Sequence, residues 1–109
     1  MKFINPRDFE SDTAWNALPI ANMNGITTRL HWTDSPYKWH VNEGEEVFVV
    51  LDGCVDMHYR DADGEHVKRM HVGDIFYAAI GTEHVAHRSL GYSETERLVC
   101  FRKPLRNSK

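Results

Sequence analysis

The residues best suited to chemistry lie in one stretch, between Trp39 and Gly53. This stretch carries an imidazole, an amide and a carboxylate, at His40, Asn42 and Glu46. Side chains alternate between the two faces of a strand, so His40 and Asn42 can project to the same side. An acidic loop separates Asn42 from Glu46. If strand pairing resumes after this loop, Glu46 shares a face of the strand with apolar residues. Such donors above an apolar floor are suited to binding a metal ion.

The elements that must position these residues are short strands separated by turns. Asp52-Gly53 is a strong hairpin signal, and the composition of residues 61–64 predicts a second hairpin loop. Turn signals recur about every 8–12 residues, which is typical of an all-β barrel or sandwich. Strands are expected at residues 26–32, 37–42, 46–51, 54–60, 67–70, 75–79, 84–88 and 98–101.

The N-terminal segment differs from the rest of the chain. Asn5 followed by Pro6 predicts a short helix, because Asn caps a helix and Pro suits its first position. The apolar residues of 15–23 are irregularly spaced, which favours an extended segment laid against the sheet. The sequence is therefore divided into an N-terminal arm, a barrel and a basic tail, at residues 1–25, 26–102 and 103–109.

Composition narrows the possible partners and location. The 109 residues suffice for one domain, and a net charge of −3 argues against sequence-independent nucleic-acid binding. No apolar run resembles a signal peptide or approaches the ~20 residues that span a membrane. Cys54 and Cys100 are too few for a disulfide framework. We expect a cytoplasmic protein without nucleic-acid or membrane partners.

The organising stretch resembles the first motif of the cupin family. That motif has two histidines one residue apart, a glutamate four residues after the second, and a glycine seven residues beyond the glutamate. His40, Glu46 and Gly53 match it, and Asn42 stands in place of the second histidine. The spacing to Gly53 favours Glu46 over Glu45 as the residue that faces the pocket, with Glu45 on the opposite face.

The second cupin motif follows at a suitable separation. It has a glycine, a proline six residues on, a glycine two later, a histidine three after that, and an asparagine four after the histidine. Gly73, Gly81 and His84 match it. Ala79 replaces the proline and Arg88 replaces the asparagine.

The resemblance covers about residues 15–102. It implies an all-β fold, a cupin-like double-stranded β-helix or jelly-roll barrel with a short N-terminal helix or extended arm. It also implies one divalent metal ion (Zn, Ni, Fe or Mn) bound by His40, Glu46 and His84. Asn42 would be a fourth ligand or would orient the others. Two imidazoles and one carboxylate are used by non-haem iron centres and by zinc sites.

Three further residues are candidates for binding a small molecule. Phe48 and Tyr77 could form the wall of a pocket for a ring-containing ligand, or could belong to the core. Arg88 lies four residues after His84, so both share a face on an unbroken strand. A guanidinium inside a barrel requires an anion. That anion is a ligand carboxylate or a protein acid, unless a bulge turns Arg88 to solvent.

Cupins include enzymes, binding proteins and proteins without metal, so the resemblance does not fix the function. The first hypothesis is a metal-binding protein that holds a small, acidic or oxygen-bearing molecule in the barrel mouth, where it could act as a metal-dependent enzyme of dioxygenase or isomerase type. The alternative is a non-catalytic sensor or storage module. No additional general base stands out, so no catalytic residue is named. Strands 47–51 and 98–101 are apolar on both faces, so the outer face needs a cover, either the segment 15–23 or a second subunit. We expect a homodimer, as the cupin resemblance also implies.

Overall fold

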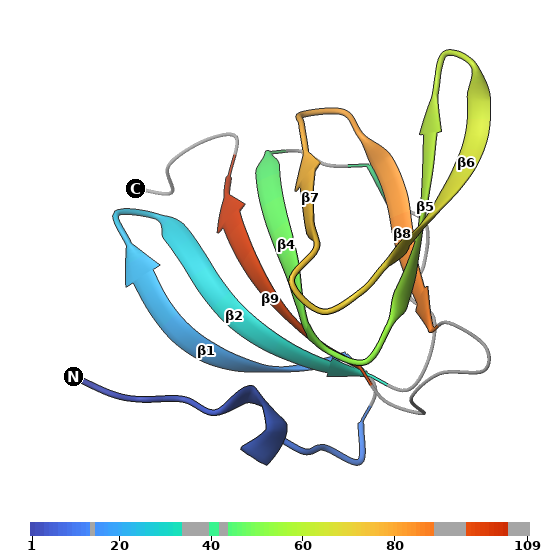
Figure 1. Cartoon of the computed structure of the whole chain (residues 1–109). Helices are drawn as coiled ribbons and strands as arrows, with labels where there is room; N and C mark the ends of the chain where they lie inside the picture. Colours follow the sequence, from blue (N-terminus) through green and yellow to red (C-terminus); the bar gives the residue numbers. More distant parts are fainter. Residues whose placement is uncertain (14, 34–39, 42–43, 89–95, 105–109) are drawn as a thin grey trace.

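The computed structural model describes residues 1–13, 15–33, 40–41, 44–88 and 96–104; for residues 40, 41, 86–88 and 96 only the backbone is described. The fold is all-β, as the sequence predicts. One sheet has the strand order β1-β2-β9-β4-β7 and the other the order β3-β8-β5-β6 (Figure 1). The elements are η1 (Pro6–Asp8), β1 (Asn16–Met23), β2 (Ile26–Thr33), β3 (His40–Val41), β4 (Glu45–Asp52), β5 (Val55–Asp61), β6 (Gly64–Met70), β7 (Ile75–Ala78), β8 (Glu83–Arg88) and β9 (Glu96–Lys103).

The hydrophobic core lies between the inner faces of the two sheets. β4 and β9 contribute from one sheet, and β5 and β6 contribute from the other, as alternation along each strand predicts. Burial of these side chains holds the two sheets face to face. The central cluster consists of Val50, Val55, Met57, Met70 and Leu98.

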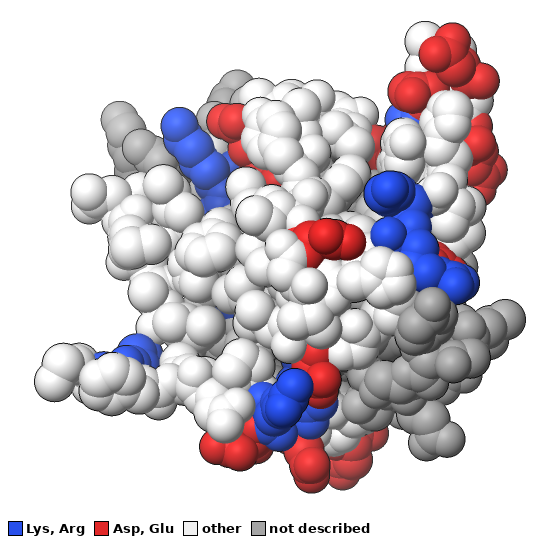
Figure 2. Space-filling model, viewed as in Figure 1, with Lys and Arg blue, Asp and Glu red and all other residues white. Residues whose placement is uncertain are grey.

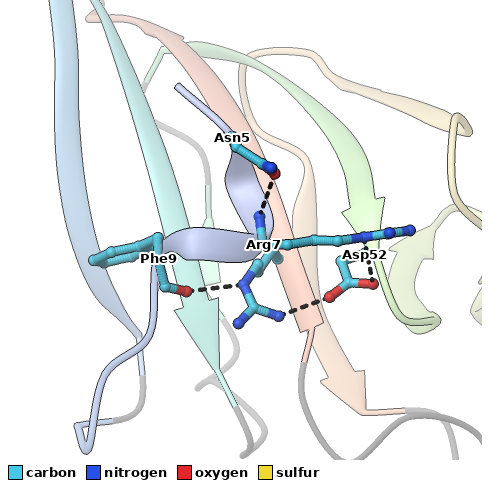
Figure 3. A network of polar contacts seen from close by, with 5 residues as sticks. Asn5, Arg7, Phe9 and Asp52 are labelled. Carbon is cyan, nitrogen blue, oxygen red and sulfur yellow. Dashed lines mark hydrogen bonds and ion pairs between the residues drawn. The ribbon is translucent and has the colours of Figure 1, made fainter. Parts of the chain in front are cut away.

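The N-terminal arm is attached to the sheet by a buried arginine. The predicted short helix is the single 3-10 turn η1, in which Asn5 Oδ1 accepts a hydrogen bond from the Arg7 backbone N–H at 3.1 Å (Figure 3). Arg97 Nε donates to the Phe9 carbonyl at 2.8 Å, and its Nη1 donates to Asp52 at 2.7 Å. One guanidinium therefore joins the arm to both β4 and β9.

The segment 16–23 is placed differently from our expectation. It does not lie against the sheet but forms β1, an edge strand paired antiparallel with β2. Asn24 and Gly25 both have positive φ values, 54° and 88°, which suit a tight hairpin. The register shifts between Pro19 and Ala21. Proline has no N–H to donate to a neighbouring strand, and an edge strand tolerates it because one of its sides has no neighbour. The sheet therefore begins at residue 16 rather than at 26.

Several strand ends meet at one end of the molecule. β4 and β8 begin there, β7 and β9 end there, and the β5–β6 hairpin projects beyond them (Figure 1). Acidic side chains gather at the tip of that hairpin (Figure 2). Residues near the starts of β4 and β8 can therefore face one another across the interior. Within the described part of the chain, no helix has the length and apolar character needed to cross a membrane.

Candidate metal and ligand site

Glu46 and His84 meet across the interior, one from each sheet. Each is the second residue of its strand, β4 or β8, and alternation turns each inward. Their side chains approach to 4.0 Å between Glu46 Oε1 and His84 Nε2. Glu46 is 8% exposed and His84 is 1% exposed. A buried carboxylate beside a buried imidazole is a donor pair that suits a metal ion, so the pair is a candidate site.

Cys100 holds the far oxygen of the Glu46 carboxylate. Its Sγ–H donates to Glu46 Oε2 at 3.3 Å in a buried contact. Burial, followed by the negative charge of Glu46, raises the pKa of the Cys100 thiol. The thiol therefore remains protonated at neutral pH and acts as a donor. This hydrogen bond leaves Oε1 directed toward His84.

Aromatic rings enclose the His84 imidazole. The Phe48 ring centroid lies 5.4 Å from that of His84, with an interplanar angle of 68°. Phe76 lies 5.6 Å from His84 and 6.2 Å from Phe48. Such ring edges and faces restrict how the imidazole can rotate.

Tyr77 does not join this group. Its side chain is 57% exposed, and its hydroxyl donates to Glu45 Oε2 at 2.6 Å. The adjacent Phe76 occupies the inward position that we expected for Tyr77, because Phe76 pairs with Phe48 across β4 and β7. The partly exposed Glu45 thus contacts Tyr77, whereas Glu46 is buried next to His84.

The other predicted site residues are placed only by their backbone or lie outside the description. His40 in β3 pairs directly with His84 in β8, and its side chain is not among those described. Asn42 lies outside the described residues. Arg88 ends β8 and pairs with Val55, and its side chain is likewise outside the description. Of the predicted metal ligands, the structure thus describes the side chains of Glu46 and His84 and the backbone position of His40.

The spacing of the described donors is close to, but wider than, that of two ligands of one metal ion. Two ligands at about 2.1 Å from one ion lie roughly 3.0–3.5 Å apart at right-angled or tetrahedral geometry. The 4.0 Å between Glu46 and His84 is slightly wider, and a small side-chain movement would close the difference. Among the side chains that the structure describes, no three of His, Cys, Asp or Glu form a group that could hold a metal. The third donor of the predicted set is His40, whose side chain lies outside the described part of the chain.

Sequence reasoning missed a lateral row that extends the site. Tyr59 in β5 pairs with His84 on one side and with His66 in β6 on the other. Paired positions of an antiparallel ladder share one face of the sheet. In the expected strand 54–60, alternation puts Tyr59 on one face with Val55 and Met57, which is the signal that the sequence offers. The pairing with His84 is non-local and does not follow from it.

The fold is similar to solved structures. No protein-family model and no curated protein sequence matches the chain. A cupin-2 domain containing protein from Shewanella frigidimarina superposes with a TM-score of 0.72 at 23% identity, covering 90% of this chain and 91% of that one. A protein from Neisseria meningitidis gives 0.71 at 18% identity, covering 94% and 99%.

An enzyme that has been solved with metal ions shares the same architecture over part of its length. Hydroxypropylphosphonic acid epoxidase from S. wedmorenis superposes with a TM-score of 0.62 at 14% identity, covering 72% of this chain and 43% of that one. That enzyme has been solved with Fe(II) and, together with substrate, with Co(II). At these identities the comparisons establish the fold. The chain therefore has the cupin fold.

Proposed function

We propose that this cupin-fold protein binds one divalent metal ion and uses it to hold a small organic molecule. His40, Glu46 and His84 would be the ligands. The observation that carries the proposal is the buried approach of Glu46 to His84 from opposite sheets. His40 is included because its β3 position pairs with His84, and paired positions share a face.

The separation of the two side chains supports a metal rather than a direct hydrogen bond. Hydrogen bonds between nitrogen and a carboxylate oxygen measure about 2.7–3.2 Å. The 4.0 Å between Glu46 and His84 exceeds this range and approaches the spacing of two ligands of one ion. A cation between them would also offset the cost of burying the carboxylate.

The chain's own residues would prepare the site for this ion. Glu46 supplies negative charge, and Cys100 fixes one oxygen of its carboxylate. Phe48 and Phe76 hold the His84 ring. When bound, the metal would supply Lewis acidity and open positions for ligand oxygens. Asn42 remains a candidate fourth ligand or orienting residue.

Elemental analysis tests the proposal. We expect about one metal ion per chain after loading with Zn, Ni, Fe or Mn and desalting, in protein purified without a metal-affinity tag. Asn42→His should retain or raise the affinity by adding an imidazole. His58→Ala, a histidine on the opposite face of β5, should bind metal like the wild type. Wild-type protein that holds no stoichiometric metal after loading would refute the proposal.

Turnover is a separate measurement from binding. Oxygen consumption by Fe(II)-loaded protein with small organic acids would identify an oxygen-using enzyme. Binding without turnover in that screen and in assays for isomerised product would favour the sensor or storage role. Cys54 and Cys100 are free thiols, which suits the reducing cytoplasm, where we propose that the protein acts.

Arg88 is proposed to contact an acidic group of the ligand. It lies four residues from His84, roughly 13 Å along a strand, so only the far end of a ligand could reach it. We expect Arg88→Ala to bind small carboxylates about tenfold more weakly by calorimetry, with unchanged metal content, because one charged contact is lost. Equal binding by both proteins would remove Arg88 from the site.

The outer face of the first sheet is proposed to form a homodimer interface. Ile75 is 67% exposed and pairs with Val49, and the next row on the same face is formed by Tyr77, Val47 and Phe101. Covering such adjacent apolar groups stabilises association. Light scattering at micromolar concentration should give the mass of two chains, and Ile75→Lys should shift it toward one. A wild-type monomer mass would contradict the proposal.

A further inference from the structure

We infer that the molecule held at this site contains a flat conjugated ring, which stacks on an aromatic wall leading from His84 to the surface. The aromatic wall consists of Phe48, Phe76, Tyr59 and His66. The inference rests on the proposed function for the polar end of the ligand, at Glu46 and His84. The aromatic wall indicates the chemical class of the rest of the ligand, beyond its polar end.

The rings of the wall form a continuous series of contacts. Phe48 and Phe76 adjoin His84 and come from the first sheet. The Phe76 centroid lies 6.5 Å from that of Tyr59 in the second sheet. Tyr59 stacks on His66 at 5.1 Å with an interplanar angle of 24°. The series therefore crosses from one sheet to the other and ends on β6.

Exposure separates the wall from the core on the same inner faces. The inward aliphatic residues Val50, Val55 and Leu98 are fully buried. All four rings of the wall are partly exposed although they also face inward. Apolar surface that faces inward and still meets solvent is the expected lining of a ligand site rather than of a closed core.

The outer end of the wall is preorganised. His66 Nε2 lies 2.9 Å from Asp61 Oδ1, so a carboxylate fixes the imidazole while its plane stacks on Tyr59. Asp61 is itself anchored at the hairpin turn, where its Oδ1 accepts a hydrogen bond from the Asp63 backbone N–H at 2.8 Å. A flat ring would meet surfaces that are already oriented, which reduces the entropy lost on binding.

Two carboxylates of similar size and charge test the preference for a flat ring. Calorimetric titration of zinc-loaded protein compares benzoate with cyclohexanecarboxylate, which differ in planarity and conjugation. We expect benzoate to bind at least about fivefold more tightly, the scale of one favourable aromatic contact. Equal binding, tighter binding of the saturated ring, or binding of neither would overturn the inference.

Variants locate the preference on the wall. Tyr59→Leu and Phe76→Leu should bring the two affinities to within about twofold of each other. Tyr77→Leu is the matched control, because Tyr77 is the next residue on β7 and faces outward. The control should retain the wild-type preference. A preference that survives both wall substitutions, or disappears in the control, would contradict the assignment. If a variant fails to fold, the wild-type comparison still decides the inference.

The two proposals can fail separately. Zinc stoichiometry is measured on the same preparations, and both titrations are repeated after chelation. Stoichiometric zinc without a ring preference would overturn the aromatic wall and leave the metal site intact. A ring preference without bound zinc would support the wall and refute the metal site.

Discussion

Two inward-facing histidines in this molecule have different surroundings. His84 lies in β8 next to Glu46, between the rings of Phe48 and Phe76. His31 lies in β2, on the face that pairs with the buried Leu98 of β9. His84 is buried and His31 is partly buried, so an inward position alone does not distinguish a candidate ligand from a structural side chain.

The charged neighbour of each histidine makes the difference. Burial lowers the pKa of His31, the positive charge of Arg29 lowers it further, and a backbone hydrogen bond with Trp15 opposes both effects. The Trp15 ring meets the imidazole edge-on at 6.3 Å. His31 is thus kept neutral beside a cation, where a metal ion would be repelled. His84 faces a carboxylate, which attracts a cation.

The largest expected effect is on metal affinity, which should depend on His84 and not on His31. His84→Ala should lower metal affinity at least about a hundredfold, because one of three strong ligands is lost. His31→Gln should leave the affinity within about twofold of wild type. Metal titration with a competing chelator measures both. Loss of metal in the His31 variant, or retention in the His84 variant, would reverse the assignment of the two histidines.

A smaller effect concerns the hydrogen bond by which Cys100 orients Glu46, the carboxylate next to His84. Cys100→Ala removes the donor to Glu46 Oε2 and should weaken metal binding about tenfold, as loss of ligand-orienting contacts does. Cys100→Ser keeps a donor at nearly the same position and should restore most of the affinity. The same chelator competition reports both variants. If Ala and Ser behave alike, the contact serves packing only.

The smallest effect concerns His31 and pH. Its lowered pKa means that the folded state resists protonation more than the unfolded chain does. As pH falls below the ordinary value of 6.5, the unfolded chain takes up the proton first, and the free energy of unfolding decreases. The slope is at most about 1.4 kcal/mol per pH unit.

Urea unfolding of metal-free protein between pH 7.5 and pH 5.5 measures this dependence. His31→Gln should lose less stability over that interval than the wild type, because Gln does not titrate. Identical losses in both proteins would show that burial of His31 does not contribute to acid sensitivity.

Local chemistry determined much of the fold from the sequence. Asp52 ends β4, and Gly53 turns the chain toward β5 with a positive φ of 78° that few other residues adopt. Alternation predicted the opposite faces of β2 and β5, since side chains in a strand have a period of two. The two cupin-like motifs led to the correct architecture, which the solved structures share.

Only the tertiary structure decided which face of each strand lies inside and what it meets there. Tyr77 and Phe76 are equivalent in a strand pattern, but pairing of β7 with β4 turns Phe76 inward and Tyr77 to solvent. The segment 16–23 gave no clear strand signal, yet the open edge of β2 pairs with it. The approach of Glu46 to His84 likewise depends on packing two sheets face to face. Such contacts join residues far apart in the chain, so local preference does not encode them.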